Sequence, residues 1–153
     1  MIEERLAELG IELPAAPGPV ASYVPVKVVG GLAFVAGQIP MADGTVSPTG
    51  AVGRDVTTEE ANDAARRCAI QALAALEEAL GSLDRVRGIA KVDVFVASAP
   101  GFTDQSKVAN GASDLLVDVF GDEGRHARAA VGVPELPLGA AVEIVLVAVV
   151  EGG

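Results

Sequence analysis

The sequence contains few of the residues on which several protein classes depend. Cys68 is the only cysteine in 153 residues, so no disulfide can form within the chain, and a reducing compartment is favoured. His126 is the only histidine, and no cysteine lies near it in the sequence. A metal site normally needs several such ligands, so we expect none.

Cationic residues are also scarce. Lysine and arginine together number 11, against 21 aspartates and glutamates, which gives a formal net charge of −10 at pH 7. The densest basic spots, Arg66-Arg67 and Arg85 with Arg87, lie among acidic residues. Because an acidic surface repels phosphate backbones, we expect no nucleic-acid partner.

Long hydrophobic runs are absent. The longest apolar stretch, 139–150, is interrupted by Glu143 and is shorter than the ~20 residues that span a bilayer. The opening MIEERLAELG is acidic and lacks the apolar core of a secretory signal. We therefore expect a soluble, cytoplasmic protein with no membrane partner. With half of its residues hydrophobic, the chain is predicted to form one domain over residues 1–153, with a lead-in over 1–22.

What is present is an alternation of strand and helix patterns. Gly30-Gly31 between two apolar runs predicts a hairpin, and Thr57 with Glu60 forms a capping box that starts a long helix ending at Gly81. The expected elements are a helix over 3–10, strands over 23–29, 32–36 and near 45–47, a helix from 57 to 81, a strand over 86–97, a helix capped by 103–104 and running to about 120, and strands over 127–133 and 140–150. This order predicts an α+β sandwich of one sheet and two long helices.

The last predicted strand is apolar on both faces. Val142, Ile144 and Leu146 alternate with Val145, Val147 and Val149, and neighbouring residues in a strand point to opposite faces. Two helices can cover only one face of such a sheet. We expect another copy of the chain to cover the second face, in an obligate homo-oligomer; the alternative is that the N-terminal segment covers it.

Two charged residues interrupt these last strands. Arg128 shares a strand face with Ala130 and Gly132, and its planar fork suits a carboxylate in a shallow pocket. Glu143 is a lone carboxylate in an apolar strand, where burial costs several kcal/mol unless it is paired. The two residues either neutralise each other at a buried interface or take part in catalysis, and the pattern alone leaves both readings open.

Two motifs resemble those of a known family. The segment ARAAVGV at 127–133, followed by Leu136-Pro137 and the VEI at 142–144, resembles the C-terminal signature of the Rid (YjgF/UK114) family. The FVAGQIP at 34–40 is similar to that family's SGQIP motif. The resemblance extends from about residue 23 to 150. The GRHAR segment at 124–128 and the N-terminal residues suggest a less characterised branch.

The resemblance implies a fold, an assembly and an activity. The fold is chorismate-mutase-like, with a mixed sheet and two long helices on one face. Three copies form a homotrimer whose sheets close into a central barrel, with active sites in clefts between subunits. Active Rid proteins hydrolyse reactive enamines and imines, such as 2-aminoacrylate, to 2-oxo acids and ammonia without a metal or organic cofactor.

The resemblance also implies roles for five positions. Arg128 corresponds to the arginine that binds the substrate carboxylate, and Glu143 to the glutamate that helps to place the attacking water. Tyr23 and Gly37 correspond to residues that line the cleft. Ala130 stands where many members have a cysteine, so the backbone carbonyl at this position is kept and the thiol is lost.

Other functions remain open at this point. A trimer could bind a small carboxylate or a partner protein without turnover, but such a binder needs only the arginine, so the presence of Glu143 favours an enzyme. The family also carries an endoribonuclease label, which the net charge and the lack of a histidine pair disfavour. We expect His126 to cap a turn or lie on the surface and Cys68 to be a core residue; the role of Asn110 is left unassigned.

Overall fold

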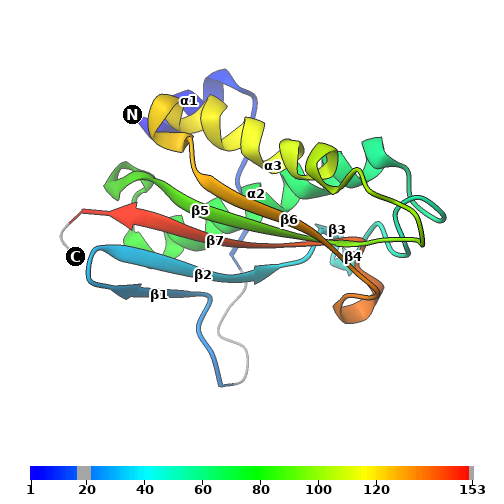
Figure 1. The fold of residues 1–153 in the computed structure, drawn as a ribbon. Helices are drawn as coiled ribbons and strands as arrows, with labels where there is room; N and C mark the ends of the chain where they lie inside the picture. Colours follow the sequence, from blue (N-terminus) through cyan, green and yellow to red (C-terminus); the bar gives the residue numbers. More distant parts are fainter. Residues whose placement is uncertain (17–21, 152–153) are drawn as a thin grey trace.

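A computed structural model describes residues 1–16 and 22–151. Its main feature is a five-stranded sheet in the order β1-β2-β7-β5-β6, with α2 and α3 packed on one face (Figure 1). The helices are α1 (Ile2–Glu8), α2 (Thr58–Leu80) and α3 (Gln105–Phe120). The strands are β1 (Val26–Val29), β2 (Leu32–Gln38), β3 (Met41–Ala42), β4 (Thr45–Val46), β5 (Val86–Ala97), β6 (Ala127–Val133) and β7 (Val142–Val150). The predicted α+β class is confirmed.

The sheet is mixed. β1, β2, β7 and β5 pair antiparallel in turn, whereas β6 pairs parallel to β5 and lies at the far edge. The turn of the β1–β2 hairpin is Gly30-Gly31, with φ values of 56° and 81°, a conformation that glycine adopts at low cost. Pro25 precedes β1. Because a proline has no backbone N–H to donate to a neighbouring strand, β1 is expected at an edge of the sheet, and it lies there.

Helix α2 begins and ends where the sequence predicts. Both capping-box bonds form: Glu60 N donates to Thr57 Oγ1 at 3.1 Å, and Thr57 N donates to Glu60 Oε1 at 3.0 Å. Gly81 ends the helix in the left-handed conformation. The buried face of α2 consists mainly of alanines, which allows the helix to approach its neighbours closely.

Helix α3 has the expected extent, but its N-terminal cap differs from the expectation. Asp104 is its N-cap residue and makes no capping hydrogen bond through its side chain. That carboxylate lies 3.8 Å from Lys107 instead. Gly111 of α3 is a close-contact position, because a Cβ there would overlap the backbone carbonyl of Asn62 on α2. The absence of a side chain at Gly111 lets the two helices touch.

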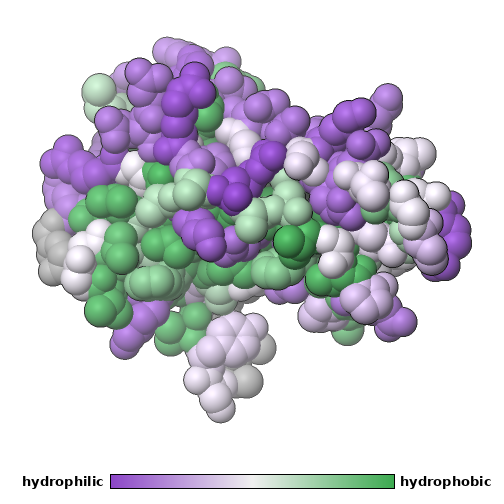
Figure 2. Space-filling model, in the orientation of Figure 1, coloured by the Kyte–Doolittle hydropathy of each residue, from purple (hydrophilic) through white to green (hydrophobic). Residues whose placement is uncertain are grey.

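The two faces of the sheet differ in what covers them. Val142, Ile144 and Leu146 of β7 point toward the helices and are fully buried. On the opposite face, here called the open face, Phe34, Val131 and Val149 are 45%, 44% and 39% exposed. Figure 2 shows apolar side chains gathered over this face. The prediction of a sheet that is apolar on both faces is confirmed.

The N-terminal helix does not lie on the open face. Helix α1 contacts α3 and the short turn Leu83–Arg85, and Arg5 Nε donates to the backbone carbonyl of Asp118 at 2.8 Å. Residues 17–21 of the predicted lead-in lie outside the described residues. Within the described ranges, no helix is long and apolar enough to cross a membrane.

Candidate functional site

Arg128 lies on the edge strand β6 and points to the helix side of the sheet. It is paired with Val92 of β5, whose side chain is fully buried beneath the helices. The guanidinium reaches α3, where Nη1 donates to Asn110 Oδ1 at 2.8 Å and to Ser113 Oγ at 3.2 Å. Both hydrogens of Nη1 therefore have an acceptor on the helix.

The rest of the guanidinium of Arg128 is available to a ligand. In residues 1–16 and 22–151, Nε and Nη2 donate to no protein acceptor, and no carboxylate lies within 4 Å of the side chain. Nε and Nη2 form the edge that can donate two parallel hydrogen bonds to one carboxylate. The half-buried side chain is thus fixed from one side and open on the other.

Ala130 lies two residues further along β6, on the same side as Arg128. It pairs with Val94 and packs partly buried against the hydrophobic core. Arg128 and Ala130 therefore lie on one face of the edge strand, as the alternation along the sequence indicated.

Glu143 lies on the open face, opposite Phe95 of β5. Its carboxylate rests against Gly37, and a Cβ at residue 37 would overlap Oε2 of Glu143. Gly37 lies where the register between β2 and β7 shifts, between Val35 and Gln38. This irregularity and the missing side chain make room for the carboxylate.

The carboxyl group of Glu143 is partly removed from water. Burial raises its pKa above the ordinary glutamate value. Among the residues that the structure describes, it accepts no hydrogen bond and has no cation within 4 Å. It is therefore a carboxylate whose oxygens are available to hold a water molecule.

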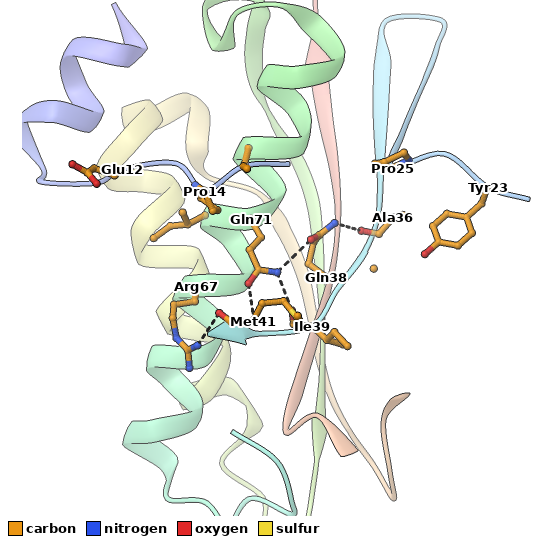
Figure 3. Close-up of a pocket in the computed structure, with 14 residues that line it drawn as sticks. Glu12, Pro14, Tyr23, Pro25, Ala36, Gln38, Ile39, Met41, Arg67 and Gln71 are labelled. Carbon is orange, nitrogen blue, oxygen red and sulfur yellow. Dashed lines mark hydrogen bonds between the residues drawn. The ribbon is translucent and has the colours of Figure 1, made fainter. Parts of the chain in front are cut away.

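Tyr23 and Gly37 line one cavity of about 610 Å³ beside α2 (Figure 3). Polar side chains of α2 in this cavity hold the chain that follows β2. Gln71 Nε2 donates to the carbonyl of Ile39 at 2.8 Å, and Gln71 Oε1 accepts from Met41 N at 2.9 Å. Arg67 donates to the carbonyl of Met41 at 3.3 Å. These groups position the cavity wall, and most of the remaining lining is apolar.

The predicted site residues thus form two separate groups. Glu143 lies on the open face against Gly37, and Gly37 also lines the cavity beside α2 together with Tyr23. Arg128 and Ala130 lie on the helix side of β6, at the opposite edge region of the sheet. Within one chain Arg128 and Glu143 point to opposite faces, so they do not neutralise each other there.

The sequence-based reading missed the side chains that hold Arg128. No sequence motif assigns a role to Asn110 or Ser113. Their spacing of three residues places both side chains on one face of a helix, and this could have indicated that they act together. Only the pairing of β6 with β5 shows that Arg128 faces them. His126 accompanies a turn as expected, with Nδ1 2.6 Å from the carbonyl of Gly124, and its Nε2 lies 2.9 Å from Ser113 Oγ.

Cys68 is a core residue, as predicted. It is fully buried on α2, and burial raises the pKa of its thiol strongly. Within the described ranges, no three histidine, cysteine or acidic side chains gather in a way that could hold a metal ion.

Comparison with known proteins identifies the family. The model of the family described as "YjgF/chorismate_mutase-like, putative endoribonuclease" matches residues 3–150. The chain belongs to this family, which includes the Rid proteins, and it has the family's fold.

Several relatives cover nearly the whole chain. The Trypanosoma cruzi protein TCP17 is 51% identical over 94% of this chain and 90% of its own length. The crystal structure of Atu1372 from Agrobacterium tumefaciens is 47% identical, with a TM-score of 0.90, over 98% of this chain and 94% of that one. A structure called a "putative endoribonuclease" from Shewanella oneidensis is 32% identical, with a TM-score of 0.93, over 98% and 99% of the two chains.

A more distant structure carries a ligand. Escherichia coli TdcF, described with bound serine, is 25% identical over 88% of this chain and 92% of that chain, with a TM-score of 0.62. The TM-scores of 0.90 and 0.93 show that the fold of this chain superposes more closely on the Atu1372 and Shewanella oneidensis structures than on TdcF.

Proposed function

We propose that this protein is a cofactor-free hydrolase of small imines and enamines that carry a carboxylate, such as 2-aminoacrylate, and that it releases 2-oxo acids and ammonia. The observation that carries the proposal is the state of Arg128. Its guanidinium is fixed on α3 through Nη1, while the edge formed by Nε and Nη2 is available to bind a carboxylate.

The proposed site is completed between copies of the chain. Arg128 with Ala130 and Glu143 with Gly37 form two half-sites on different faces of one sheet, and Tyr23 lines the cavity that Gly37 also borders. A single chain cannot bring them around one small substrate. The exposed apolar side chains of the open face supply a surface for a second copy, and the family resemblance favours a homotrimer.

The chemistry needs little from the protein. An imine carbon is electrophilic once its nitrogen is protonated, so the site must hold the carboxylate, orient one water and exclude others. Arg128 binds the carboxylate. Glu143 holds the water and accepts its proton as the water oxygen attacks the C=N carbon. Glu143 then returns that proton to the nitrogen, and ammonia leaves as the C–N bond breaks, the hydroxyl loses its proton and the C=O bond forms. The raised pKa of Glu143 suits a group that takes up and returns this proton.

The TdcF structure supports the class of ligand. That relative is described with serine bound, and serine is a small molecule with a carboxylate and a nitrogen on the adjacent carbon. Imines of amino acids share this arrangement, so a site related to that of TdcF suits them.

A coupled assay tests the proposal. An amino-acid oxidase generates imines from several amino acids, and their decay is followed with and without the protein. We expect faster decay with the wild-type chain and no acceleration with Arg128→Ala, whose oligomeric state and melting temperature should match the wild type. Unchanged activity in that variant would refute the role of Arg128.

Oligomeric state is the second arm of the test. Light scattering should show a trimer, and a monodisperse monomer at dilute concentration would overturn the composite site. If the trimer binds carboxylates without accelerating imine decay, the protein is a binding module.

The endoribonuclease activity in the family's description has less support in this chain. The net charge is −10, and several exposed cations already have an acid within 4 Å, among them Arg54, Arg87, Lys91 and Arg125. Retained RNA cleavage in a Glu143→Gln variant that has lost imine hydrolysis would show a separate nuclease function.

A further inference from the structure

The position of Arg128 depends on a chain of hydrogen bonds that extends behind it, away from the proposed ligand. Arg128 Nη1 lies 3.2 Å from Ser113 Oγ, and Ser113 Oγ lies 2.9 Å from His126 Nε2. His126 Nδ1 lies 2.6 Å from the backbone carbonyl of Gly124. These hydrogen bonds thus connect strand β6, helix α3 and the turn at Gly124 through the side chains of Arg128, Ser113 and His126.

The direction of each bond follows from which atoms carry hydrogen. A carbonyl oxygen only accepts, so His126 Nδ1 donates to Gly124. In the neutral ring Nε2 then has a free lone pair, and the Ser113 hydroxyl donates to it. An arginine nitrogen only donates, so Ser113 Oγ accepts from Arg128. Each of the three hydrogen bonds then has one donor and one acceptor.

His126 fixes the orientation of a hydroxyl group that would otherwise rotate. A serine hydroxyl on a helix can turn its hydrogen toward the backbone carbonyls of the preceding turn. With its hydrogen held by His126, Ser113 presents its lone pairs to Arg128. His126 is in turn fixed by Gly124, which is buried and lies so close to α3 that a Cβ would overlap the carbonyl of Leu116.

We propose that Ser113 and His126 are positioning residues for Arg128: together they fix its guanidinium so that the Nε and Nη2 edge binds the carboxylate of a small 2-oxo or 2-imino acid. Asn110 supplies the second acceptor for Nη1, and the Ser113–His126 pair sets the rotation of the group about that contact. This inference rests on the proposed function only for the class of ligand.

Ligand binding to the full-length oligomer tests the proposal. The probe is 2-oxobutanoate, and the matched neutral probe is 2-oxobutanamide, which has the same shape without the charge. Because a hydrogen bond to a charged group contributes appreciably, we expect Ser113→Ala and His126→Ala each to weaken 2-oxobutanoate binding about tenfold or more. Their affinity for 2-oxobutanamide should match the wild type.

Two controls separate positioning from general damage. Ser113→Thr keeps the hydroxyl and should bind 2-oxobutanoate as the wild type does. Ser106→Ala removes an exposed hydroxyl from the same helix and should change neither affinity. Equal weakening of both ligands in Ser113→Ala, or unchanged 2-oxobutanoate binding, would overturn the proposal.

A second measurement needs no ligand and so distinguishes this inference from the proposed function. Nitrogen-15 NMR of the Arg128 guanidinium reports its rotation. We expect separate Nη1 and Nη2 resonances in the wild type that merge in Ser113→Ala and broaden in His126→Ala. If the wild type binds neither probe, the proposed function fails, and the NMR result alone decides the inference: a freely rotating guanidinium in the wild type overturns it.

Discussion

The carboxylate of Glu143 occupies the space that any side chain at residue 37 would fill. Gly37 and Glu143 lie on neighbouring strands, and the register shift in β2 brings the glycine backbone against the acid. The lack of a side chain at Gly37, in the segment FVAGQIP, therefore determines where the carboxylate of Glu143 can lie.

Gly37→Ala should displace Glu143 and leave the fold intact. The overlap involves Oε2, the far end of a flexible side chain, so the carboxylate can rotate away and the melting temperature should change little. Because misplacing a catalytic group by about 1 Å costs on the order of 10²-fold in rate, imine hydrolysis should fall by a comparable factor.

A double-mutant cycle checks the route of that effect. In a Glu143→Ala background there is no carboxylate to displace, so adding Gly37→Ala should cost no further activity. If the glycine substitution lowers the residual rate of that background as much as it lowers the wild-type rate, Gly37 acts through something other than Glu143.

The pH profile of imine hydrolysis should show the desolvation of Glu143. Burial raises the pKa of this carboxyl above the ordinary value of 4.5, so as pH falls it becomes protonated earlier than an exposed glutamate does. The activity should therefore fall along an acid limb whose midpoint lies above that value. Measuring kcat/KM against pH for the wild type and Glu143→Gln checks this, because the residual rate of the variant should lack that limb.

Gly111→Ala should destabilise the protein although alanine favours helix by about 1 kcal/mol over glycine. The new Cβ meets the backbone carbonyl of Asn62, which cannot move without shifting α2. Overpacking of this kind costs about 1–3 kcal/mol, and more where backbone must shift. Denaturant unfolding measures the loss in the free energy of unfolding, with the exposed-site variant Ser106→Ala as control. A more stable Gly111→Ala protein would show that α2 and α3 can accommodate a methyl group at residue 111.

Cys68 should be inert in the folded protein. Its side chain is fully buried, and burial raises the pKa of the thiol, so almost no thiolate forms at pH 8. A thiol reagent such as DTNB should react with no cysteine in the native state and with one after unfolding in guanidinium. Rapid native-state labelling would contradict the packing of α2 against the sheet.

The elements that the sequence predicted well are those with local signals. The glycines of the β1–β2 turn, the Thr57–Glu60 capping box and the alternation of β5 all act within a few residues, and each boundary agrees closely with the structure. The short strand β3 was missed. Met41 is held by Gln71 and Arg67 of α2, and such long-range bonds leave no pattern in the neighbouring sequence.

The candidate site was predictable residue by residue but not in its arrangement. Alternation along β6 placed Arg128 and Ala130 on one face, and the interruption of β7 identified Glu143. Whether Arg128 and Glu143 face each other depends on the parallel pairing of β6 with β5 and the antiparallel pairing of β7. Those registers join segments far apart in the chain, so the opposite placement of the two residues became visible only in three dimensions.

Complementation between two impaired variants tests the composite site most directly. Arg128→Ala and Glu143→Gln chains carrying different tags are co-expressed, and mixed oligomers are isolated through both tags and verified by native mass spectrometry. Some interfaces in these oligomers combine an intact Arg128 from one chain with an intact Glu143 from another. We predict that imine hydrolysis, which falls to a low residual rate in either variant alone, rises in the mixed oligomers; mixed oligomers that form and stay at that residual rate would contradict a site shared between copies.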